Sequence, residues 1–327
     1  FESVRGLCNH GIGIIFVSHR MNEVRELSDR ITILRDGVVI VDGVPMSEKT
    51  DEEIVSDMLG EKLNTEEKKR KDSNAFESSA EVLSISFDGY DGELTVKEGE
   101  IVGLAGLAGS GRSSVLRTIW GTKPRSDIHL RYLGEEYKPK NPMHALKKKI
   151  AYISEDRSES GLFFGQPIKE TVLMAHRNLQ RKLLVKNKSE DKLLGQIIGE
   201  VQIKVPTHEC MPEALSGGNQ QKLLFGRWIT DEAKLLLLDE PTRGVDIKTK
   251  HEIYQRVRKM VEANNAGALV VSSELEELVL MCDKVLIIRD GHVEDVLTGD
   301  RITENNMMAE ITASGKTKQQ TEDSKSV

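Results

Sequence analysis

The chain has 327 residues, of which 38% are hydrophobic and 30% charged, and its formal net charge is −7. This balance is typical of a soluble globular protein of about two domains. The negative charge argues against a nucleic-acid partner, and an aromatic content of 4% offers little surface for base stacking. No apolar run approaches the ~20 residues that span a bilayer. The three cysteines lie far apart and show no metal-ligand spacing.

The first segment predicts a short α/β unit. Residues 13–17 form an apolar run, which predicts a strand, and residues 21–29 are expected to be helical. A strand is expected at residues 30–34. Asp36-Gly37 then marks a hairpin turn, and the chain returns over residues 38–41.

A polar stretch follows and breaks the pattern. Residues 61–79 read EKLNTEEKKRKDSNAFESS, with mixed charges and no apolar periodicity. This composition predicts an inter-domain linker. Its basic run is flanked by acidic residues, which favours a solvated linker over a phosphate-binding patch. Residues 313–327 are also polar and are predicted to be a disordered tail.

A glycine-rich loop opens the next domain. Residues 81–87 and 93–96 are expected to form strands of an antiparallel layer, and residues 101–105 a buried strand. The sequence GLAGSGRSS, residues 106–114, matches the phosphate-binding form G-x-x-x-x-G-K-[ST] except at Arg112, and a helix is expected over residues 113–120. Glycines let backbone N–H groups surround phosphates, and Ser113 is placed to give an oxygen to Mg²⁺.

The middle of the chain carries a second anion-binding pattern. A strand is expected at residues 150–153, followed by Ser-Glu-Asp-Arg, and residues 169–205 are expected to be mostly helical. The sequence LSGGNQQK then places a small Ser-Gly-Gly turn, residues 216–218, before a helix that runs from residue 220 to residue 228. Backbone N–H groups at such a turn can approach an anion, and a helix N-terminus attracts phosphate.

An acidic pair follows an unbroken apolar run. Residues 235–238 are all leucine, as expected for a strand buried on both faces of a parallel sheet. Asp239 and Glu240 stand at its carboxyl end, where open α/β sheets bind ligands. Two carboxylates there suit Mg²⁺ and a positioned water. Asp246 is expected to cap a helix over residues 247–262.

The end of the chain repeats its beginning. Residues 269–271 predict a strand, residues 274–281 a helix and residues 284–288 another strand before Asp290-Gly291. VSHRMNEV aligns with VSSELEEL, and ITILRDG aligns with VLIIRDG. Such a repeat indicates two homologous domains. The chain is therefore interpreted as part of a longer tandem protein. Residues 1–60 are the C-terminal part of a first domain, and residues 61–79 are the linker between the two domains. Residues 80–312 form a complete second domain, and residues 313–327 are the tail.

Together, the glycine-rich loop, LSGGNQQK and LLLLDEPTRGVD resemble the P-loop, signature and Walker B motifs of ATP-binding-cassette (ABC) ATPases. The resemblance covers residues 13–312. It is strongest to the tandem ATPases of bacterial monosaccharide importers of the ribose, galactose and xylose type. It implies an α/β P-loop NTPase fold: a mixed core sheet with helices, an antiparallel β layer and a helical signature subdomain.

The resemblance also implies roles for individual residues. Catalysis is assigned to Glu240, to His19 as the switch histidine of the first copy, and to Ser273, which replaces that histidine in the second copy. Magnesium is assigned to Ser113, Asp239 and Glu155, the last standing where the family has glutamine. Asp246 matches the D-loop. ATP contacts fall on Gly106, Gly109, Ser110, Gly111, Arg112, Ser113 and Ser114, and contacts to the ATP of a partner cassette on Ser216, Gly217, Gly218 and Gln220.

The implied protein is a subunit that binds and hydrolyses ATP with Mg²⁺ on the cytoplasmic face of the cell membrane. It would power sugar import through transmembrane permease subunits, served indirectly by a periplasmic or lipoprotein sugar-binding protein. The first cassette or a second copy would complete each ATP site, the first site hydrolysing and the second mainly binding ATP. Three alternatives are a nucleoside importer, a binding-only regulatory cassette and a translation-type ABC protein, the last disfavoured by a short linker of mixed charge.

Overall fold

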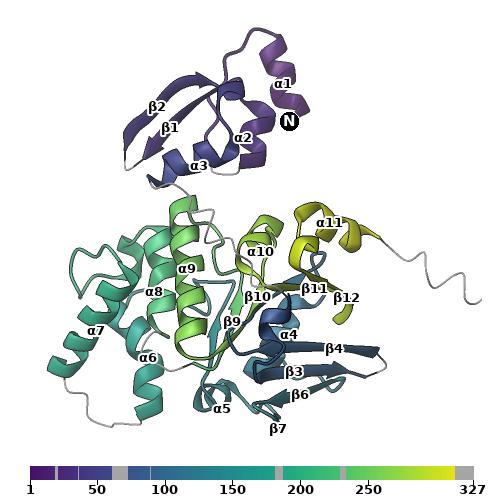
Figure 1. Cartoon of the computed structure of the whole chain (residues 1–327). Helices are drawn as coiled ribbons and strands as arrows, with labels where there is room; N and C mark the ends of the chain where they lie inside the picture. Colours follow the sequence, from purple (N-terminus) through teal and green to yellow (C-terminus); the bar gives the residue numbers. More distant parts are fainter. Residues whose placement is uncertain are drawn as a thin grey trace, which may run out of the picture. The chain divides into compact units, whose positions relative to one another are not determined.

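The structure, a computed structural model, describes residues 1–18, 21–35, 37–60, 73–88, 90–180, 187–228 and 233–313. The chain divides into two compact units, Phe1–Lys69 with Val245–Glu252 and Arg70–Gly244 with Ile253–Val327 (Figure 1). Most of the predicted linker and all but one residue of the predicted tail lie outside the described residues. Ser73–Phe76, within the linker prediction, form a short 3₁₀ helix, η3, and Phe76 is buried.

The smaller unit is built around one hairpin and its helices. Its elements are α1 (Glu2–Asn9), α2 (Met21–Leu27), β1 (Arg30–Arg35), β2 (Val38–Pro45), η1 (Met46–Glu48) and α3 (Asp51–Leu59). Strands β1 and β2 pair antiparallel, which confirms the predicted hairpin. Its buried core is small and consists of Met21, Ile33, Met46 and Ile54. Thr50 and Glu53 form a capping box at the start of α3.

The strand predicted at residues 13–17 was wrong. Residues 12–18 belong to no strand, and the side chains of Ile15 and Val17 are 96% and 91% exposed. The aligned segment of the second copy, β10 (Gly267–Val271), is a strand because β5 and β9 pair with both of its edges. Among the described residues of the smaller unit, only β1 and β2 are strands, so residues 13–17 have no sheet to join.

The larger unit contains a six-stranded sheet in the order β12-β11-β5-β10-β9-β8. Only β12, at one edge, runs antiparallel to its neighbour. The strands are β5 (Ile101–Ala105), β8 (Ile150–Ile153), β9 (Leu235–Asp239), β10, β11 (Lys284–Arg289) and β12 (His292–Thr298). Every residue of β5, β9 and β10 is buried, as the apolar runs predict for the centre of a parallel sheet. The carboxyl ends of β9 and β10 therefore meet at one edge of the sheet.

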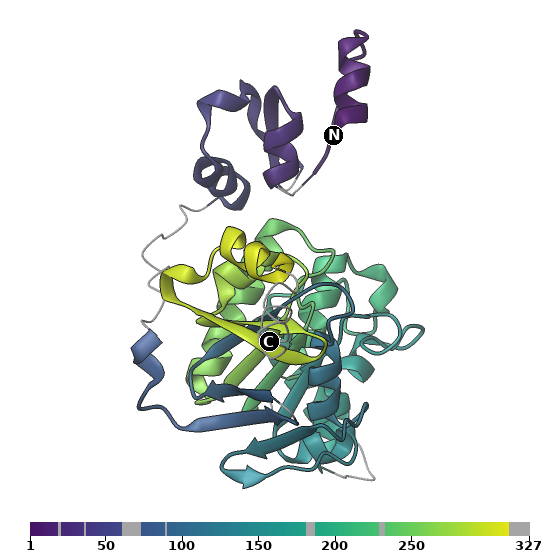
Figure 2. The same ribbon diagram turned by 90° about the vertical axis from the view of Figure 1, so that its right-hand side faces the viewer.

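A four-stranded antiparallel sheet in the order β4-β3-β6-β7 lies beside the six-stranded sheet (Figure 2), and side chains of both sheets form one core cluster. Its strands are β3 (Glu81–Phe87), β4 (Tyr90–Lys97), β6 (Ile128–Tyr132) and β7 (Glu135–Glu136). Helix α4 (Arg112–Trp120) contributes Val115, Leu116 and Ile119 to the core cluster that joins the two sheets. Burying these side chains fixes the start of α4 beside the carboxyl end of β5.

The helices predicted between residues 169 and 205 are α6 (Ile168–Gln180) and α7 (Asn187–Val201), which pack with α8 (Gly217–Gly226) around a second apolar core. Arg177 of α6 pairs with Glu190 of α7 at 2.7 Å. The remaining helices are α5 (Pro142–Lys147), η4 (Pro212–Ala214), α9 (Ile247–Ala263), α10 (Leu275–Met281), η5 (Gly299–Arg301) and α11 (Glu304–Thr312).

The two similar segments near the beginning and the end of the sequence have the same order of helices and strands. The order α10-β11-β12-η5-α11 repeats the order α2-β1-β2-η1-α3. Both hairpins shift register at the equivalent point, between Ile33 and Leu34 in one and between Ile287 and Ile288 in the other. Thr50 and Thr303 cap the last helix of each set. The sequence similarity therefore corresponds to the same local structure.

A buried carboxylate ties helix α9 to the sheet and generates a stability prediction. Asp283 is 7% exposed and accepts hydrogen bonds from the Ile101 N–H at 2.8 Å and from two Arg258 nitrogens at 2.8 and 3.0 Å. Asp283→Asn should lower the free energy of unfolding in urea by about 1.5–3 kcal/mol, because charge-assisted hydrogen bonds are lost. Asp295→Asn removes an exposed pair with Arg301 and should change it by less than about 0.5 kcal/mol. Equal effects would contradict this interpretation.

Candidate functional site

The glycine-rich loop lies between β5 and α4, and its shape requires glycine. Gly109 and Gly111 have φ values of +82° and +96°. A side chain at Gly111 would bring its Cβ within 2.9 Å of Gly291 Cα, and one at Gly106 would meet the Ile288 carbonyl oxygen. No side chain caps the first turn of α4. The buried Ser110 Oγ has no hydrogen-bond partner. The loop is thus a backbone cradle whose N–H groups suit an anion.

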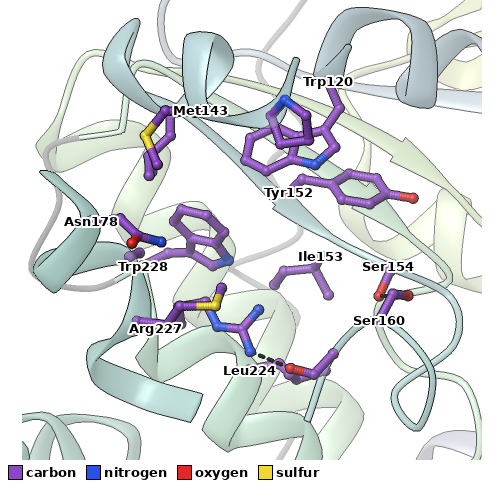
Figure 3. Close-up of a pocket in the computed structure, with 15 residues that line it drawn as sticks. Trp120, Met143, Tyr152, Ile153, Ser154, Ser160, Asn178, Leu224, Arg227 and Trp228 are labelled. Carbon is purple, nitrogen blue, oxygen red and sulfur yellow. Dashed lines mark hydrogen bonds between the residues drawn. The ribbon is translucent and has the colours of Figure 1, made fainter. Parts of the chain in front are cut away.

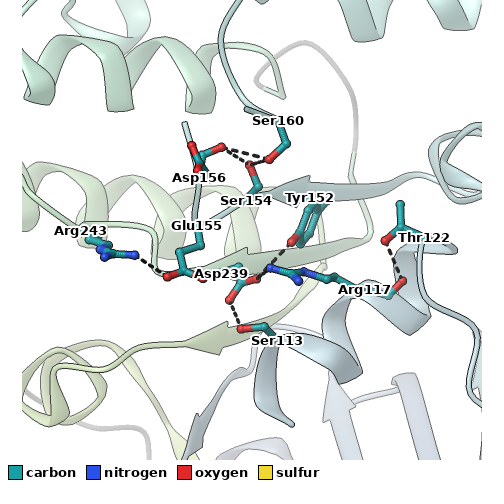
Figure 4. A network of polar contacts seen from close by, with 10 residues as sticks. All are labelled: Ser113, Arg117, Thr122, Tyr152, Ser154, Glu155, Asp156, Ser160, Asp239 and Arg243. Atoms are coloured by element: carbon teal, nitrogen blue, oxygen red, sulfur yellow. Dashed lines mark hydrogen bonds and ion pairs between the residues drawn. The ribbon is translucent and has the colours of Figure 1, made fainter. Parts of the chain in front are cut away.

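Asp239 is the buried carboxylate beside this loop. It ends β9, is fully buried, and accepts hydrogen bonds from Ser113 Oγ to Oδ1 at 2.7 Å and from the Tyr152 hydroxyl to Oδ2 at 3.1 Å (Figure 4). Arg117 Nη2 lies 3.9 Å from Oδ2. Burial raises the pKa of Asp239, and the two hydroxyl hydrogen bonds oppose that shift. Ser113 and Asp239, both assigned to magnesium by the sequence, thus lie within hydrogen-bond distance of each other.

Glu240 follows in a strained conformation. Its φ of +52° is left-handed, which is uncommon for a residue other than glycine and is typical of functional sites. Its N–H donates to the Val271 carbonyl at 2.9 Å, which holds it against the end of β10. Ser273 Oγ donates to Glu240 Oε2 at 3.1 Å. Burial raises the pKa of Glu240, while the hydrogen bonds from Ser273 lower it.

Arg112 stands at the start of α4 among these acids. Its Nη1 donates to the Ser272 carbonyl oxygen at 2.7 Å. Burial lowers the pKa of Arg112, and the negative charges of Glu240, Asp239 and Glu155 oppose that shift. Ser272 is in turn held by Glu277, a buried carboxylate that accepts hydrogen bonds from Ser272 Oγ at 2.5 Å and from Thr242 Oγ1 at 2.7 Å. Arg112 is therefore positioned by the loop after β10.

The third expected magnesium ligand has a different partner. Glu155 is half-buried, and its carboxylate pairs with Arg243 (Figure 4). Within the described parts of the chain, no group of three or more His, Cys, Asp or Glu side chains is arranged to hold a metal ion. The hydroxyl of Ser113 and the carboxylate of Asp239 are hard oxygen donors of the kind Mg²⁺ prefers. They fit an ion whose other ligands are phosphate oxygens and water.

The Ser-Gly-Gly turn forms the N-terminus of α8. Ser216 caps this helix by accepting a hydrogen bond from the Asn219 N–H at 3.4 Å. Gln220, which the sequence placed among the ATP contacts, donates to the carbonyls of Pro212 and Leu215 and so braces the preceding loop. Among the hydrogen bonds of the described residues, none joins Ser216 or Gly218 to Asp239 or Glu240. The structure thus does not bring the turn onto the acidic pair of its own chain.

The sequence also assigned roles to Asp246 and His19. Asp246 caps α9 by accepting hydrogen bonds from the Thr249 N–H at 3.0 Å and from Thr249 Oγ1 at 2.9 Å. His19 lies outside the described residues.

Sequence reasoning missed three side chains that organise the site. Arg117 lies four residues after Ser113 in α4 and so shares its face, which was a usable signal. Tyr152 is the polar-tipped aromatic residue of the otherwise aliphatic β8, and a buried tyrosine hydroxyl usually has a partner. Arg157 donates to the Gly217 carbonyl at 2.8 Å, which links the loop after β8 to the Ser-Gly-Gly turn. No local pattern marks that contact.

A pocket of about 220 Å³ opens behind Tyr152 (Figure 3). Trp120, Met143 and Trp228 line it with Tyr152, so it lies between the sheet and the helical group. Arg227 also lines it, is 5% exposed, and donates to the carbonyls of Thr171 and Gly161. Burial lowers the pKa of Arg227 to about 10.

In the described chain, no helix combines the length and apolarity needed to cross a bilayer.

The sequence of this chain is similar to those of known proteins. Residues 91–243 match the family described as ABC transporter. The chain is 33% identical over 313 residues to a putative ribose/galactose/methyl galactoside import ATP-binding protein of Albidiferax ferrireducens, covering 94% of this chain and 62% of that protein. It is 34% identical over 312 residues to the ribose import ATP-binding protein of Bacillus subtilis, with the same coverage. The chain thus spans less than two thirds of the length of these relatives.

Solved structures show the same fold. A nucleotide-free ATP-binding cassette from an ABC transporter superposes with a TM-score of 0.58 at 17% identity, over 70% of this chain and 95% of that one. A dimeric post-hydrolysis cassette bound to ADP and Pi gives a TM-score of 0.56 at 19% identity, over 66% of this chain and 98% of that one. These neighbours confirm the predicted α/β fold, which is that of ATP-binding cassettes.

The position of Arg112 generates a binding prediction. Arg112→Ala should weaken ATP binding, measured by titration calorimetry with Mg²⁺, by about tenfold to a hundredfold, because a charge-assisted contact to phosphate is lost. Arg112→Lys keeps the charge and should stay within about fivefold of the parent chain. Arg131→Ala, which removes an exposed arginine that contacts Gly134, is the matched control and should bind normally. Unchanged ATP affinity in Arg112→Ala would show that Arg112 does not contribute to phosphate binding and that its role is the hydrogen bond to Ser272.

Proposed function

Residues 91–243 of this chain are an ABC transporter domain, and on this premise we propose that the chain binds ATP with Mg²⁺ and helps to power the import of a monosaccharide through a membrane permease. The proposal rests on one observation above the others. Asp239 and Glu240 meet the glycine-rich loop at the carboxyl ends of β9 and β10. Ser113 donates a hydrogen bond to Asp239, and Ser273 donates one to Glu240. This is an anion cradle next to an acidic pair, the combination that ATP chemistry requires.

Each residue has a role that follows from its position. The backbone of residues 106–111 and the N-terminus of α4 receive the phosphates, and Arg112 neutralises their charge. Ser113 and Asp239 would hold Mg²⁺, which would supply positive charge to offset that of the phosphates. Glu240 orients a water for in-line attack on the γ-phosphorus. As the new P–O bond forms, Glu240 accepts the water proton and the bridging oxygen leaves with ADP.

The departures from the family pattern favour holding ATP over rapid turnover at this site. Ser273 gives Glu240 a neutral hydroxyl, which cannot take up a proton near neutral pH as imidazole can. The Glu155 carboxylate brings negative charge to a place where the family has a neutral amide. We propose that the site with His19 is the hydrolytic one of an unlike pair and that Ser216, Gly217 and Gly218 close it across a cassette interface.

The importer assignment is supported by the relatives. Their printed names describe ribose, galactose or methyl galactoside import, and 94% of this chain aligns with them. The proposed partners are permease subunits and, indirectly, a periplasmic or lipoprotein sugar-binding protein, with the chain peripheral on the cytoplasmic face of the membrane. A first cassette or a second copy would supply the other half of each ATP site. Closure on ATP and reopening after hydrolysis would drive the permease.

One observation bears on each of two other functions. A nucleoside importer of related build usually has proline where Ser154 stands, so Ser154 favours a sugar. A binding-only cassette is favoured by Arg112, Glu155 and Ser273, whereas the retained and buried Glu240 favours hydrolysis.

Replacing Glu240 separates hydrolysis from binding. Glu240→Gln should leave ATP affinity, measured by calorimetry, within about threefold of the parent chain and reduce phosphate release by about a hundredfold or more, because an amide cannot accept the proton. The parent chain alone should turn over slowly. If its phosphate release is unaffected by Glu240→Gln, hydrolysis does not occur at this site and the binding-only function is favoured.

Restoring a histidine tests the cause of slow turnover. Ser273 is exposed and bonded to Glu240, so Ser273→His would place an imidazole beside the acidic pair. Phosphate release should rise by about tenfold, because a proton-accepting, phosphate-contacting group is regained. Ser273→Ala, which removes the hydroxyl and adds nothing, should not increase it. A decrease in both variants would show that the Ser273 hydroxyl itself supports the reaction.

A further inference from the structure

Three aromatic side chains from separate elements form a continuous cluster along the pocket (Figure 3). Trp120 ends α4, Tyr152 belongs to β8, and Trp228 follows α8. The rings of Trp120 and Tyr152 stack with centroids 5.6 Å apart and planes inclined by 27°. Trp120 and Trp228 meet edge to face at 6.1 Å. Such pairs attract beyond simple burial, so the three rings hold one another's orientation.

The far end of this cluster reaches the nucleotide site. The Tyr152 hydroxyl donates to Asp239 Oδ2 at 3.1 Å, while Ser113 occupies Oδ1 (Figure 4). Burial raises the pKa of Tyr152, so the hydroxyl keeps its proton and remains a donor at neutral pH. The side chain of Asp239 is thus restrained at both oxygens, once from the loop that receives phosphate and once from the aromatic cluster.

We propose that Tyr152 is a positioning residue that fixes the Asp239 carboxylate for the metal–nucleotide complex and couples it to Trp120 and Trp228. This inference rests on the proposed function, because it needs ATP to bind at Asp239. Binding of the metal–nucleotide complex at Asp239 would change the Tyr152 contact, and the stacked Trp120 ring would shift with it. The adjoining 220 Å³ pocket leaves the rings room to shift, which a close-packed core would not allow. The same contacts connect Asp239 to the end of α8, the helix that begins with the Ser-Gly-Gly turn.

The intrinsic tryptophan fluorescence of the chain can be used to follow this cluster. Trp120 and Trp228 are its two tryptophans, so all tryptophan emission comes from the cluster. The purified chain is titrated with ATP and Mg²⁺ while affinity is measured by calorimetry and emission by fluorescence. Tyr152→Phe keeps the ring and removes only the hydroxyl. It should weaken ATP binding by about three- to tenfold, the effect of losing one hydrogen bond, and reduce the nucleotide-induced emission change at saturation by at least about half.

The matched control is Tyr137→Phe. Tyr137 is also buried, and its hydroxyl donates to the carbonyl of Ile119 in α4 at 3.1 Å. Tyr137→Phe therefore also removes one hydroxyl oxygen and one hydrogen bond, but it leaves the contacts of Asp239 unchanged. This variant should show normal ATP affinity and a normal emission change, although its melting temperature falls like that of Tyr152→Phe.

The outcomes separate the two proposals. If the parent chain binds no ATP, the proposed function fails and the coupling fails with it. If it binds ATP and Tyr152→Phe binds and responds identically, the positioning role of Tyr152 is overturned while the proposed function stands. If Tyr137→Phe loses affinity and emission response as Tyr152→Phe does, the effect is general destabilisation, which also overturns the positioning role.

Discussion

The carboxylate of Asp239 has no exposed surface and is held by two hydroxyl groups that arrive from different elements, Ser113 from α4 and Tyr152 from β8. A buried charge without such partners is costly, so the site can form only where these elements converge. That requirement links the parts of the larger unit. The two sheets bury α4, α4 places Ser113 and Arg112, and β8 places Tyr152 beside β9. The candidate site is thus a consequence of how the core packs.

The charges around this carboxylate define the chemistry that the site can support. Arg112 and Arg117 bring positive charge, while Asp239, Glu240 and Glu155 bring negative charge. Glu155 pairs with Arg243, and Glu240 accepts neutral hydrogen bonds from Ser273. Under the proposed function, the backbone loop and Arg112 would hold phosphate, because neither depends on Glu155 or on a histidine.

The repeated segment shows how much of local structure depends on its neighbours. The hairpins β1-β2 and β11-β12 form in both copies, with the register shift at the same place, because a hairpin supplies its own hydrogen-bond partners. Residues 13–17 and β10 have similar apolar sequences, yet only β10 is a strand, since parallel strands depend on partners distant in the chain. Ile288 is 1% exposed where the equivalent Leu34 is 61% exposed, for the same reason.

The sequence by itself located the central strands of the larger unit and predicted the main chemistry of the site. Apolar runs located β5, β8 and β9, turn glycines located the loop at 106–111, and motif spacing identified Ser113, Asp239 and Glu240. Only the tertiary structure decided which side chains meet across elements. The Tyr152 contact to Asp239, the Arg157 contact to Gly217 and the diversion of Glu155 to Arg243 join residues 60 to 88 positions apart. No local pattern encodes such contacts, because they arise only when segments distant in the sequence pack together.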